Sequence, residues 1–183
     1  DWSSDVCSSD LIEKTGYLRL SEFSSNTADR VQEALDSFKS AGFTSLVIDL
    51  RNNGGGLLSA AVDIADKFID SGIIVSTKSR ISSENSVYTA SARKTKVAKN
   101  FPVVVLINGA SASASEILAG ALKDSKTAYL VGERSYGKGS VQIPTPLISK
   151  DGFKITVARY YSPSDVNIDK RGIKPDREVK YPE

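Results

Sequence analysis

The sequence contains no histidine, and this absence restricts how any of its serines could act as a nucleophile. A serine hydroxyl attacks a substrate efficiently only when a neighbouring base accepts its proton. The stretch NGASASASEILAG, residues 108–120, places three serines at alternate positions in front of an apolar, helix-like run. If one of these serines is a nucleophile, a side chain other than histidine must be its base.

Cysteine, net charge and long apolar runs are also scarce. The single cysteine, Cys7, lies in the first eleven residues, so the remaining sequence has no disulfide chemistry and its redox compartment stays open. The formal net charge of +2 is too small to predict a nucleic-acid partner. Apolar runs such as VVVLI, 103–107, are far shorter than the ~20 residues of a membrane span. The 183 residues, 40% hydrophobic and 25% charged, therefore predict one soluble globular domain, and no motif calls for a metal or cofactor.

The first eleven residues, DWSSDVCSSDL, differ from the rest of the chain in composition. They contain the only tryptophan and show neither helical nor strand periodicity. They resemble the conceptual translation of a sequencing adapter, so we interpret residues 1–11 as an assembly scar and residues 12–183 as the native part. The alternative is a natural, disordered N-terminal segment.

Alternating strand and helix patterns follow. Apolar runs predict strands over 15–23, 45–51, 102–108, 128–133, 140–148 and 153–162. Helices are expected at 57–69, at 113–125, and after residue 26, where Val31, Ala34, Leu35 and Phe38 share one helical face and Gly42 ends the helix. The polar segment 79–100 reads as a surface loop. This order predicts an α/β fold with a mainly parallel sheet and flanking helices.

Two strand–loop–helix units carry the loops of greatest interest, NNGGG at 52–56 and GASAS at 109–113. In open α/β sheets the functional crevice lies at the carboxyl ends of the strands, where helix N-termini present free N–H groups. If the strands before these loops are neighbours, the two loops face one another across one crevice.

Each candidate residue also has a purely structural interpretation. Ser113 and Glu116 fit a capping box, in which they bond the first backbone N–H groups of a helix. Lys138 stands between two glycines, where the backbone can approach another group closely, and Gln142 would share a strand face with it. The stretch GERSYGKGS, 132–140, approaches a phosphate-binding loop, but Gly139 replaces the required Ser or Thr and a strand pattern follows.

Four motifs in order resemble the peptidase core of the C-terminal processing peptidases, also called tail-specific proteases. They are DLRNNGGGLL (49–58), NGASASASEILAGAL (108–122), VGERSYGKGSVQ (131–142) and ITVARYYSPS (155–164). The resemblance implies a serine endopeptidase with a Ser/Lys dyad, an acyl-enzyme and a crotonase-like or ClpP-like core. It identifies Ser113 as the nucleophile, Lys138 as the general base and Gln142 as the residue that positions this base.

Physical chemistry is compatible with these roles. A lysine accepts a proton only when it is neutral, and burial disfavours its charged form. The tetrahedral intermediate also needs hydrogen-bond donors for its oxyanion. The N–H groups of Ala114 and of one glycine among 54–56 are the candidates, and we favour Gly55.

The sequence departs from this family in one respect, because residues 12–183 leave no room for the PDZ domain that usually captures the substrate's tail. The resemblance further implies polypeptide substrates and a parent protein outside the cytoplasm, in the cell envelope or secreted, of bacterial origin. It leaves a homo-oligomer open. Two alternatives remain: a catalytically silent relative that only binds, and an acyl-CoA enzyme with the same fold.

Overall fold

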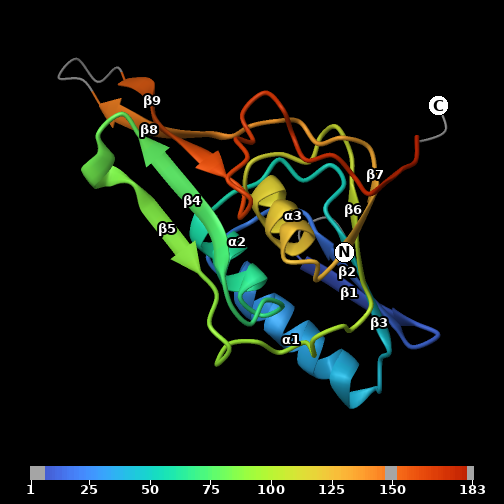
Figure 1. Ribbon diagram of the computed structural model, residues 1–183. Helices are drawn as coiled ribbons and strands as arrows, with labels where there is room; N and C mark the ends of the chain where they lie inside the picture. Colours follow the sequence, from blue (N-terminus) through green and yellow to red (C-terminus); the bar gives the residue numbers. More distant parts are fainter. Residues whose placement is uncertain (1–6, 147–151, 181–183) are drawn as a thin grey trace.

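The computed structural model describes residues 7–146 and 152–180, which form two β-sheets and three α-helices (Figure 1). The larger sheet has the strand order β1-β2-β3-β6-β7-β10 and is parallel except for β1 against β2. The predicted α/β fold with a mainly parallel sheet is confirmed. Its strands are β1 (Cys7–Ile12), β2 (Thr15–Leu20), β3 (Ser45–Asp49), β6 (Val103–Ile107), β7 (Tyr129–Gly132) and β10 (Arg177–Glu178).

The three predicted helices are present as α1 (Thr27–Ser40), α2 (Leu58–Ala65) and α3 (Ala114–Asp124). Helix α1 ends before Gly42, which has the left-handed φ of 71° expected after a helix terminus. Helix α2 ends at Ala65 and is shorter than the predicted 57–69. Phe68 and Ile69 are buried, as their apolar pattern indicates, but they lie in the segment after the helix. The predicted core face of α1 is buried, with Val31, Ala34, Leu35 and Phe38 at most 6% exposed.

Strands β3 and β6 are direct neighbours in the sheet, which brings their two loops together. Their parallel register pairs Leu46 with Val103 and Ile48 with Val105, and all four side chains are buried. Continuous apolar sequence predicts strands that are buried on both faces. In the structure, buried residues of β3 and β6 alternate with partly exposed ones, so the second face of these strands is only partly covered. The loops 52–56 and 109–113 therefore leave the sheet at the same edge, as the functional crevice requires.

The second sheet is antiparallel, with the order β5-β4-β9-β8, and it was only half predicted. The prediction of a surface loop over 79–100 is wrong in part, because this range contains the end of β4, a short 3-10 helix η1 (Ser82–Glu84) and strand β5. These strands form because β4 pairs with both β5 and β9, a long-range contact that local polarity hides. The end of the strand predicted for 140–148 lies outside the described residues. The bounds are β4 (Ile73–Ser79), β5 (Ser86–Thr89), β8 (Ser140–Pro146) and β9 (Gly152–Tyr161).

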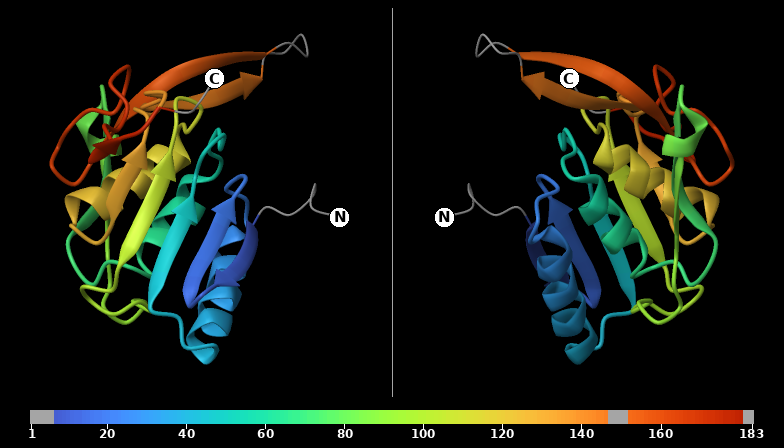
Figure 2. Two further views of the ribbon diagram at one scale, coloured as in Figure 1. Left: turned by 90° about the vertical axis from the view of Figure 1, so that its right-hand side faces the viewer. Right: turned by 90° about the vertical axis from the view of Figure 1, so that its left-hand side faces the viewer.

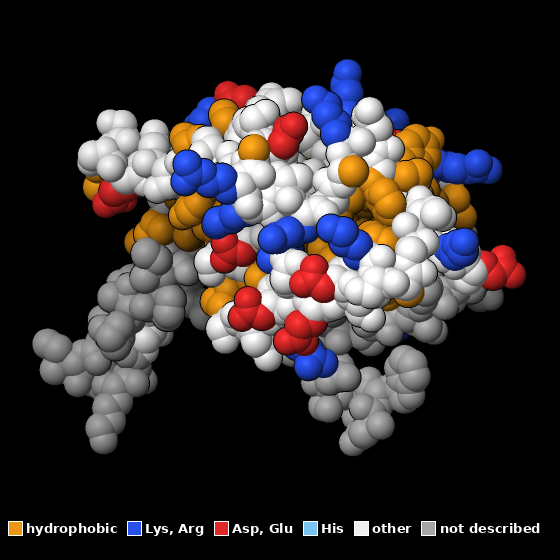
Figure 3. Space-filling model, turned by 90° about the horizontal axis from the view of Figure 1, so that it is seen from below, with side chains coloured by type: hydrophobic (Ala, Val, Ile, Leu, Met, Phe, Trp, Pro, Cys, Tyr) orange, Lys and Arg blue, Asp and Glu red, His pale blue; other side chains and the backbone are white. Residues whose placement is uncertain are grey.

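The helices lie on one face of the larger sheet. Strand β4 packs against α2 and α3 on the side of these helices that faces away from the sheet (Figure 2). The β8–β9 hairpin extends away from this body (Figures 1 and 2). On the face shown in Figure 3, basic and acidic side chains are interspersed. None of the described helices is long and apolar enough to cross a membrane.

Residues 7–12 form strand β1, which pairs antiparallel with β2 along its whole length. Sequence periodicity did not predict this strand, because a segment that adds to a sheet edge needs only backbone pairing. The pairing shows that the chemical origin of residues 1–11 and their contribution to folding are separate questions. Their interpretation as an assembly scar stays a prediction.

Candidate active site

Hydrogen bonds join the two loops at the sheet edge. Asn52 N–H donates to Asn108 Oδ1 (3.0 Å), and Asn108 Nδ2 donates to Asn52 Oδ1 (2.8 Å). The backbone N–H of Ala112 donates to Asn53 O (3.0 Å). A Cβ placed on Gly55 would lie 2.7 Å from Ser113 Cβ, so only glycine allows the loops to approach this closely. The two loops form one structural unit around Ser113.

The structure distinguishes the three alternate serines by burial. Ser111 and Ser115 are 0% exposed, and their hydroxyls donate to backbone carbonyls, Ser111 Oγ to Leu50 O (2.8 Å) and Ser115 Oγ to Asn53 O (3.0 Å). Both hydroxyls hold the two loops together. Ser113, between them, is partly exposed. Of the three, it is the serine that a substrate can reach.

Ser113 also has an unusual backbone conformation. It is the N-cap of α3, with φ 57° and ψ −116°. A positive φ is unfavourable for a residue with a side chain and persists only where the surroundings enforce it. A strained turn between a strand and a helix is the arrangement that presents nucleophilic serines in many hydrolases. The strain supports a functional role for Ser113 beyond helix capping.

Glu116 connects the helix terminus to the segment that contains Lys138. Its side chain is 0% exposed. Oε2 accepts hydrogen bonds from the backbone N–H of Ser113 (2.9 Å) and of Lys138 (2.8 Å). Oε1 accepts them from Ser135 Oγ and from the N–H of Gly137, both at 2.6 Å. The capping box predicted only the contact with Ser113, whereas the other three depend on tertiary packing.

The backbone of Lys138, the predicted base, lies near that of Ser113, the predicted nucleophile, but the Lys138 side chain is not buried. Lys138 and Gln142 are exposed, and no hydrogen bond joins either side chain to the other or to Ser113 among the described residues. The burial that would favour a neutral lysine is therefore absent at Lys138. Lys138 also precedes β8, which begins at Ser140, so it does not share a strand with Gln142.

The two proposed oxyanion donors differ in availability. The Gly55 N–H donates to Asn53 Oδ1 (2.8 Å), so this donor is already engaged. The Ala114 N–H lies at the first position of α3 and has no acceptor among the described residues. Helix N-termini leave such groups free. The structure thus favours Ala114 over Gly55 as a donor that a substrate oxygen can use.

A cluster that the sequence analysis did not single out lies at the end of β3. Asp49, 1% exposed, accepts hydrogen bonds from Arg51 through Nε (2.9 Å) and Nη2 (2.6 Å) and from Tyr17 Oη (2.6 Å). Burial alone would raise the pKa of Asp49, but these donors outweigh it and hold that pKa below its usual value. Burial, together with the bond to Asp49, raises the pKa of Tyr17. In the sequence, the nearby acid and base of the DLR motif at 49–51 could have indicated this cluster.

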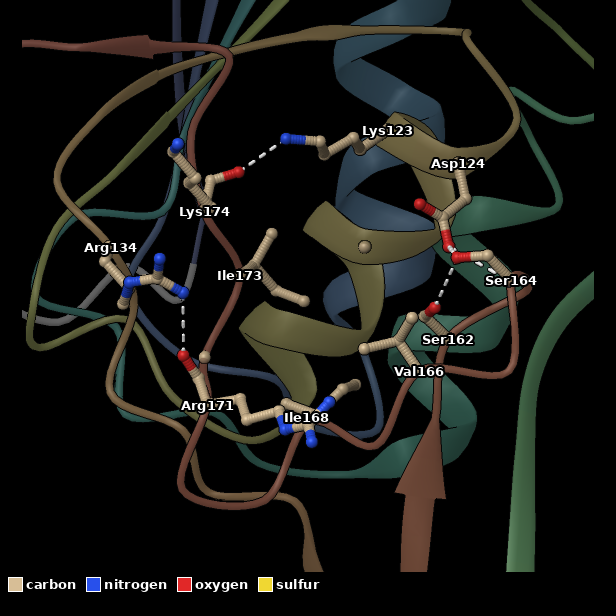
Figure 4. A pocket seen from close by; sticks show the side chains of 12 residues that line it. Lys123, Asp124, Arg134, Ser162, Ser164, Val166, Ile168, Arg171, Ile173 and Lys174 are labelled. Carbon is tan, nitrogen blue, oxygen red and sulfur yellow. Dashed lines mark hydrogen bonds between the residues drawn. The ribbon is translucent and has the colours of Figure 1, made fainter.

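Other features of the described residues lie elsewhere. A cavity of about 300 Å³ is lined by Arg134, by residues of the second half of α3 and by residues of 162–174, and neither Ser113 nor Lys138 is part of it (Figure 4). No group of three or more His, Cys, Asp or Glu within the described ranges is placed to hold a metal ion.

A partly exposed, strained serine at a helix N-terminus, with a free N–H beside it, is the arrangement of a serine hydrolase. Residues 14–179 match peptidase family S41, and the chain belongs to this family of serine-type peptidases.

Related proteins agree with this assignment. The chain is 42% identical over 166 residues to the chloroplastic C-terminal processing peptidase of Tetradesmus obliquus, covering 90% of this chain and 35% of the relative. It is 44% identical over 170 residues to the carboxyl-terminal-processing protease of Synechocystis sp., covering 93% and 39%. A solved structure of the photosystem II D1 C-terminal processing protease superposes with a TM-score of 0.86 at 37% identity, over 96% of this chain and 48% of that one. The chain thus spans little more than a third of the length of these two curated relatives.

Proposed function

We propose that this chain is the catalytic core of a serine endopeptidase that cleaves polypeptides at or near their C-terminal tails. Ser113 is the nucleophile and forms the acyl-enzyme, Lys138 is the general base, and Gln142 orients the lysine. The observation that carries the proposal is the difference among the three serines of residues 111–115. Ser111 and Ser115 are buried and bonded to carbonyls, whereas Ser113 is partly exposed on a strained turn.

The position of the Lys138 backbone supports its role as the base. One oxygen of Glu116 accepts hydrogen bonds from the N–H groups of both Ser113 and Lys138, so the two residues lie close together although 25 positions separate them. A lysine is flexible, and a bound substrate would cover its exposed amine and disfavour its charge. In this proposal the lysine side chain rotates toward Ser113 and its amine accepts the hydroxyl proton.

Oxyanion stabilisation comes from the start of α3 and from the glycine loop. The Ala114 N–H supplies one donor. The second comes from 54–56, and Gly55 contributes only if its N–H exchanges Asn53 for the substrate oxygen. Loss of one such donor raises the barrier by roughly 3–4 kcal/mol.

The substrate class rests on the named relatives, which process C-terminal ends. We propose polypeptide tails as substrates, no cofactor, and a full-length bacterial parent that acts outside the cytoplasm, in the cell envelope or secreted. A PDZ domain in the parent is part of the same proposal, which leaves a homo-oligomer open.

The test is peptide hydrolysis by single serine variants. Ser113→Ala abolishes cleavage of an unfolded casein-like polypeptide, while Ser111→Ala and Ser115→Ala retain measurable activity. Thermal unfolding is measured for each variant, because loss of a helix cap alone destabilises by about 1 kcal/mol. If Ser115→Ala is folded but inactive while Ser113→Ala is active, the nucleophile is Ser115 and the assignment to Ser113 is wrong.

An acyl-CoA thioester serves as a second substrate in the same assay. Hydrolysis of the thioester without peptide cleavage would favour an acyl-CoA enzyme. Tail-peptide binding without either reaction would favour a catalytically silent relative.

A further inference from the structure

The segment that carries Lys138, here called the lysine loop (residues 134–139), is held between two other parts of the molecule. On one side its backbone bonds to Glu116 of α3. On the other side it contacts residues 168–173, here called the brace. The Lys170 N–H donates to Gly137 O (2.8 Å). A Cβ on Gly139 would lie 2.2 Å from Asp169 N, so the glycines beside Lys138 permit this close approach.

Ser135 connects both sides through one hydroxyl group. Its Oγ donates to Glu116 Oε1 (2.6 Å) and accepts a hydrogen bond from the Ile173 N–H (2.6 Å). Its own N–H donates to Ile173 O (3.1 Å). The side chain is 5% exposed, so these bonds are shielded from water. The hydroxyl therefore acts both as donor to the helix residue and as acceptor from the brace.

Figure 4 shows the outer side of the brace, where Ile173 points toward α3 and Arg134 Nη1 donates to Arg171 O (3.0 Å). Ile173 is 9% exposed, and its Cδ1 lies 3.2 Å from the position a Cβ on Gly120 would occupy. The brace is therefore anchored on α3 as well, and the lysine loop has little freedom to shift relative to that helix.

The acceptor capacity of Glu116 is matched to its donors. Four hydrogen bonds reach its two oxygens, two at each, and three of the four donors are backbone N–H groups. A buried carboxylate without its donors is strongly disfavoured, so the bonds hold one another in place. In Glu116→Gln, the NH2 group would replace one carboxylate oxygen. This group is itself a donor and could not accept the two hydrogen bonds that reach that oxygen.

We propose that Glu116 and Ser135 are positioning residues, which fix the lysine loop against the N-terminus of α3 and so bring Lys138 within reach of Ser113. They touch neither the substrate nor the reacting atoms. The inference rests on the proposed function, because it assigns them a role in the Ser113 and Lys138 chemistry. Ser135 links this alignment to the brace, so displacement of residues 168–173 would also misplace the base.

The first test compares two buried serines. Ser135→Ala removes the shared hydroxyl and preserves the charge of Glu116. Ser162→Ala is the matched control, since Ser162 is 7% exposed and its hydroxyl group shares a hydrogen bond only with the hydroxyl of Ser164 among the described residues. We expect Ser135→Ala to lower kcat roughly 10- to 100-fold, the effect of a small misplacement of a reacting group, with KM nearly unchanged. Ser162→Ala keeps its kcat. A purely structural role for Ser135 predicts a lower melting temperature and the wild-type kcat, and that result would overturn the proposal.

The second test does not depend on activity. Amide hydrogen exchange is measured for Ser113, Gly137 and Lys138 in the wild type and in Glu116→Gln. We expect all three N–H groups to exchange faster in the variant, and Glu116→Gln to lower the rate at which a fluorophosphonate labels Ser113. The double variant with Ser135→Ala should lose no more activity than Glu116→Gln alone, because both act through one contact. Unchanged exchange at Gly137 and Lys138 would refute the arrangement. By contrast, equal peptide cleavage by wild type and Ser113→Ala refutes the proposed function, whatever the exchange data show.

Discussion

Replacement of Gly55 by alanine tests whether the close approach of the glycine loop to Ser113 is required. Gly55 has φ 102°, a conformation that costs a residue with a side chain about 1–3 kcal/mol. The added Cβ would also lie 2.7 Å from both Ala112 O and Ser113 Cβ. Overpacking of this kind costs a further ~1–3 kcal/mol. The expected destabilisation is therefore about 2–6 kcal/mol, a large part of the 5–15 kcal/mol that is typical of a domain.

Calorimetry and a peptidase assay measure the two consequences. For a chain of this size each kcal/mol lowers the melting temperature by about 2–4 °C, so we expect a decrease of roughly 10 °C. Below the unfolding transition, displacement of Ser113 should reduce kcat about 100-fold.

Gly54 offers the matched control in the same loop. A Cβ on Gly54 would have no heavy atom within 4 Å, and its φ is not positive. Gly54→Ala should therefore keep the melting temperature or raise it slightly, because alanine restricts the unfolded chain. If Gly55→Ala unfolds at the wild-type temperature and remains active, the argument from close approach is wrong. If Gly54→Ala is damaged equally, the loop is sensitive for a different reason.

Three further predictions concern the base, the Asp49 cluster and the N-terminal segment. Lys138→Arg should be as inactive as Lys138→Ala in peptide cleavage, because a guanidinium stays protonated, whereas Gln142→Ala should retain part of the activity; an active Lys138→Arg would eliminate the dyad. The pKa of Asp49 is lower in the folded protein than in the unfolded chain, where it is about 3.9. The ionised carboxylate therefore stabilises the fold at pH values above about 3.9, and this stabilisation is lost as the pH falls through the folded-state pKa. Asp49→Asn should thus be less stable than the wild type at pH 7, and the difference should shrink below about pH 4 in denaturant titrations. Deletion of residues 1–11 should leave the melting temperature and activity unchanged, since β2 keeps its pairing with β3; a decrease of several degrees would show that β1 contributes to folding.

The sequence was most informative where a local pattern reflects burial. The apolar runs at 45–51 and 102–108 predicted two core strands, and Leu46, Ile48, Val103 and Val105 are indeed buried. Strand β5 could not be predicted in this way. Its residues SVYT alternate between partly buried and exposed, and they form a strand because β4 lies beside them.

In the candidate site, too, contacts that follow from a local sequence pattern were predictable, and contacts that depend on tertiary packing were not. The strand–loop–helix pattern predicted that 52–56 and 109–113 meet if their strands are neighbours, and the pairing of β3 with β6 meets this condition. The capping box predicted the bond between Glu116 and the Ser113 N–H. The bonds from Ser135, Gly137 and Lys138 were not predictable, because these residues lie 19–22 positions from Glu116. Their contact depends on how β7 and the brace pack against α3.

The paired amides of Asn52 and Asn108 also affect how the protein ages. Asn108 precedes Gly109, and asparagine followed by glycine is the sequence in which side-chain amides hydrolyse most readily. Hydrolysis at Asn108 would replace the NH2 group that now donates to Asn52 Oδ1 with a carboxylate oxygen. Two acceptors would then face each other, and the contact between the loops 52–56 and 109–113 would weaken although the bonds from Ala112, Ser111 and Ser115 remain. Slow deamidation of this one residue during storage would therefore lower the peptidase activity, while most of the fold persists.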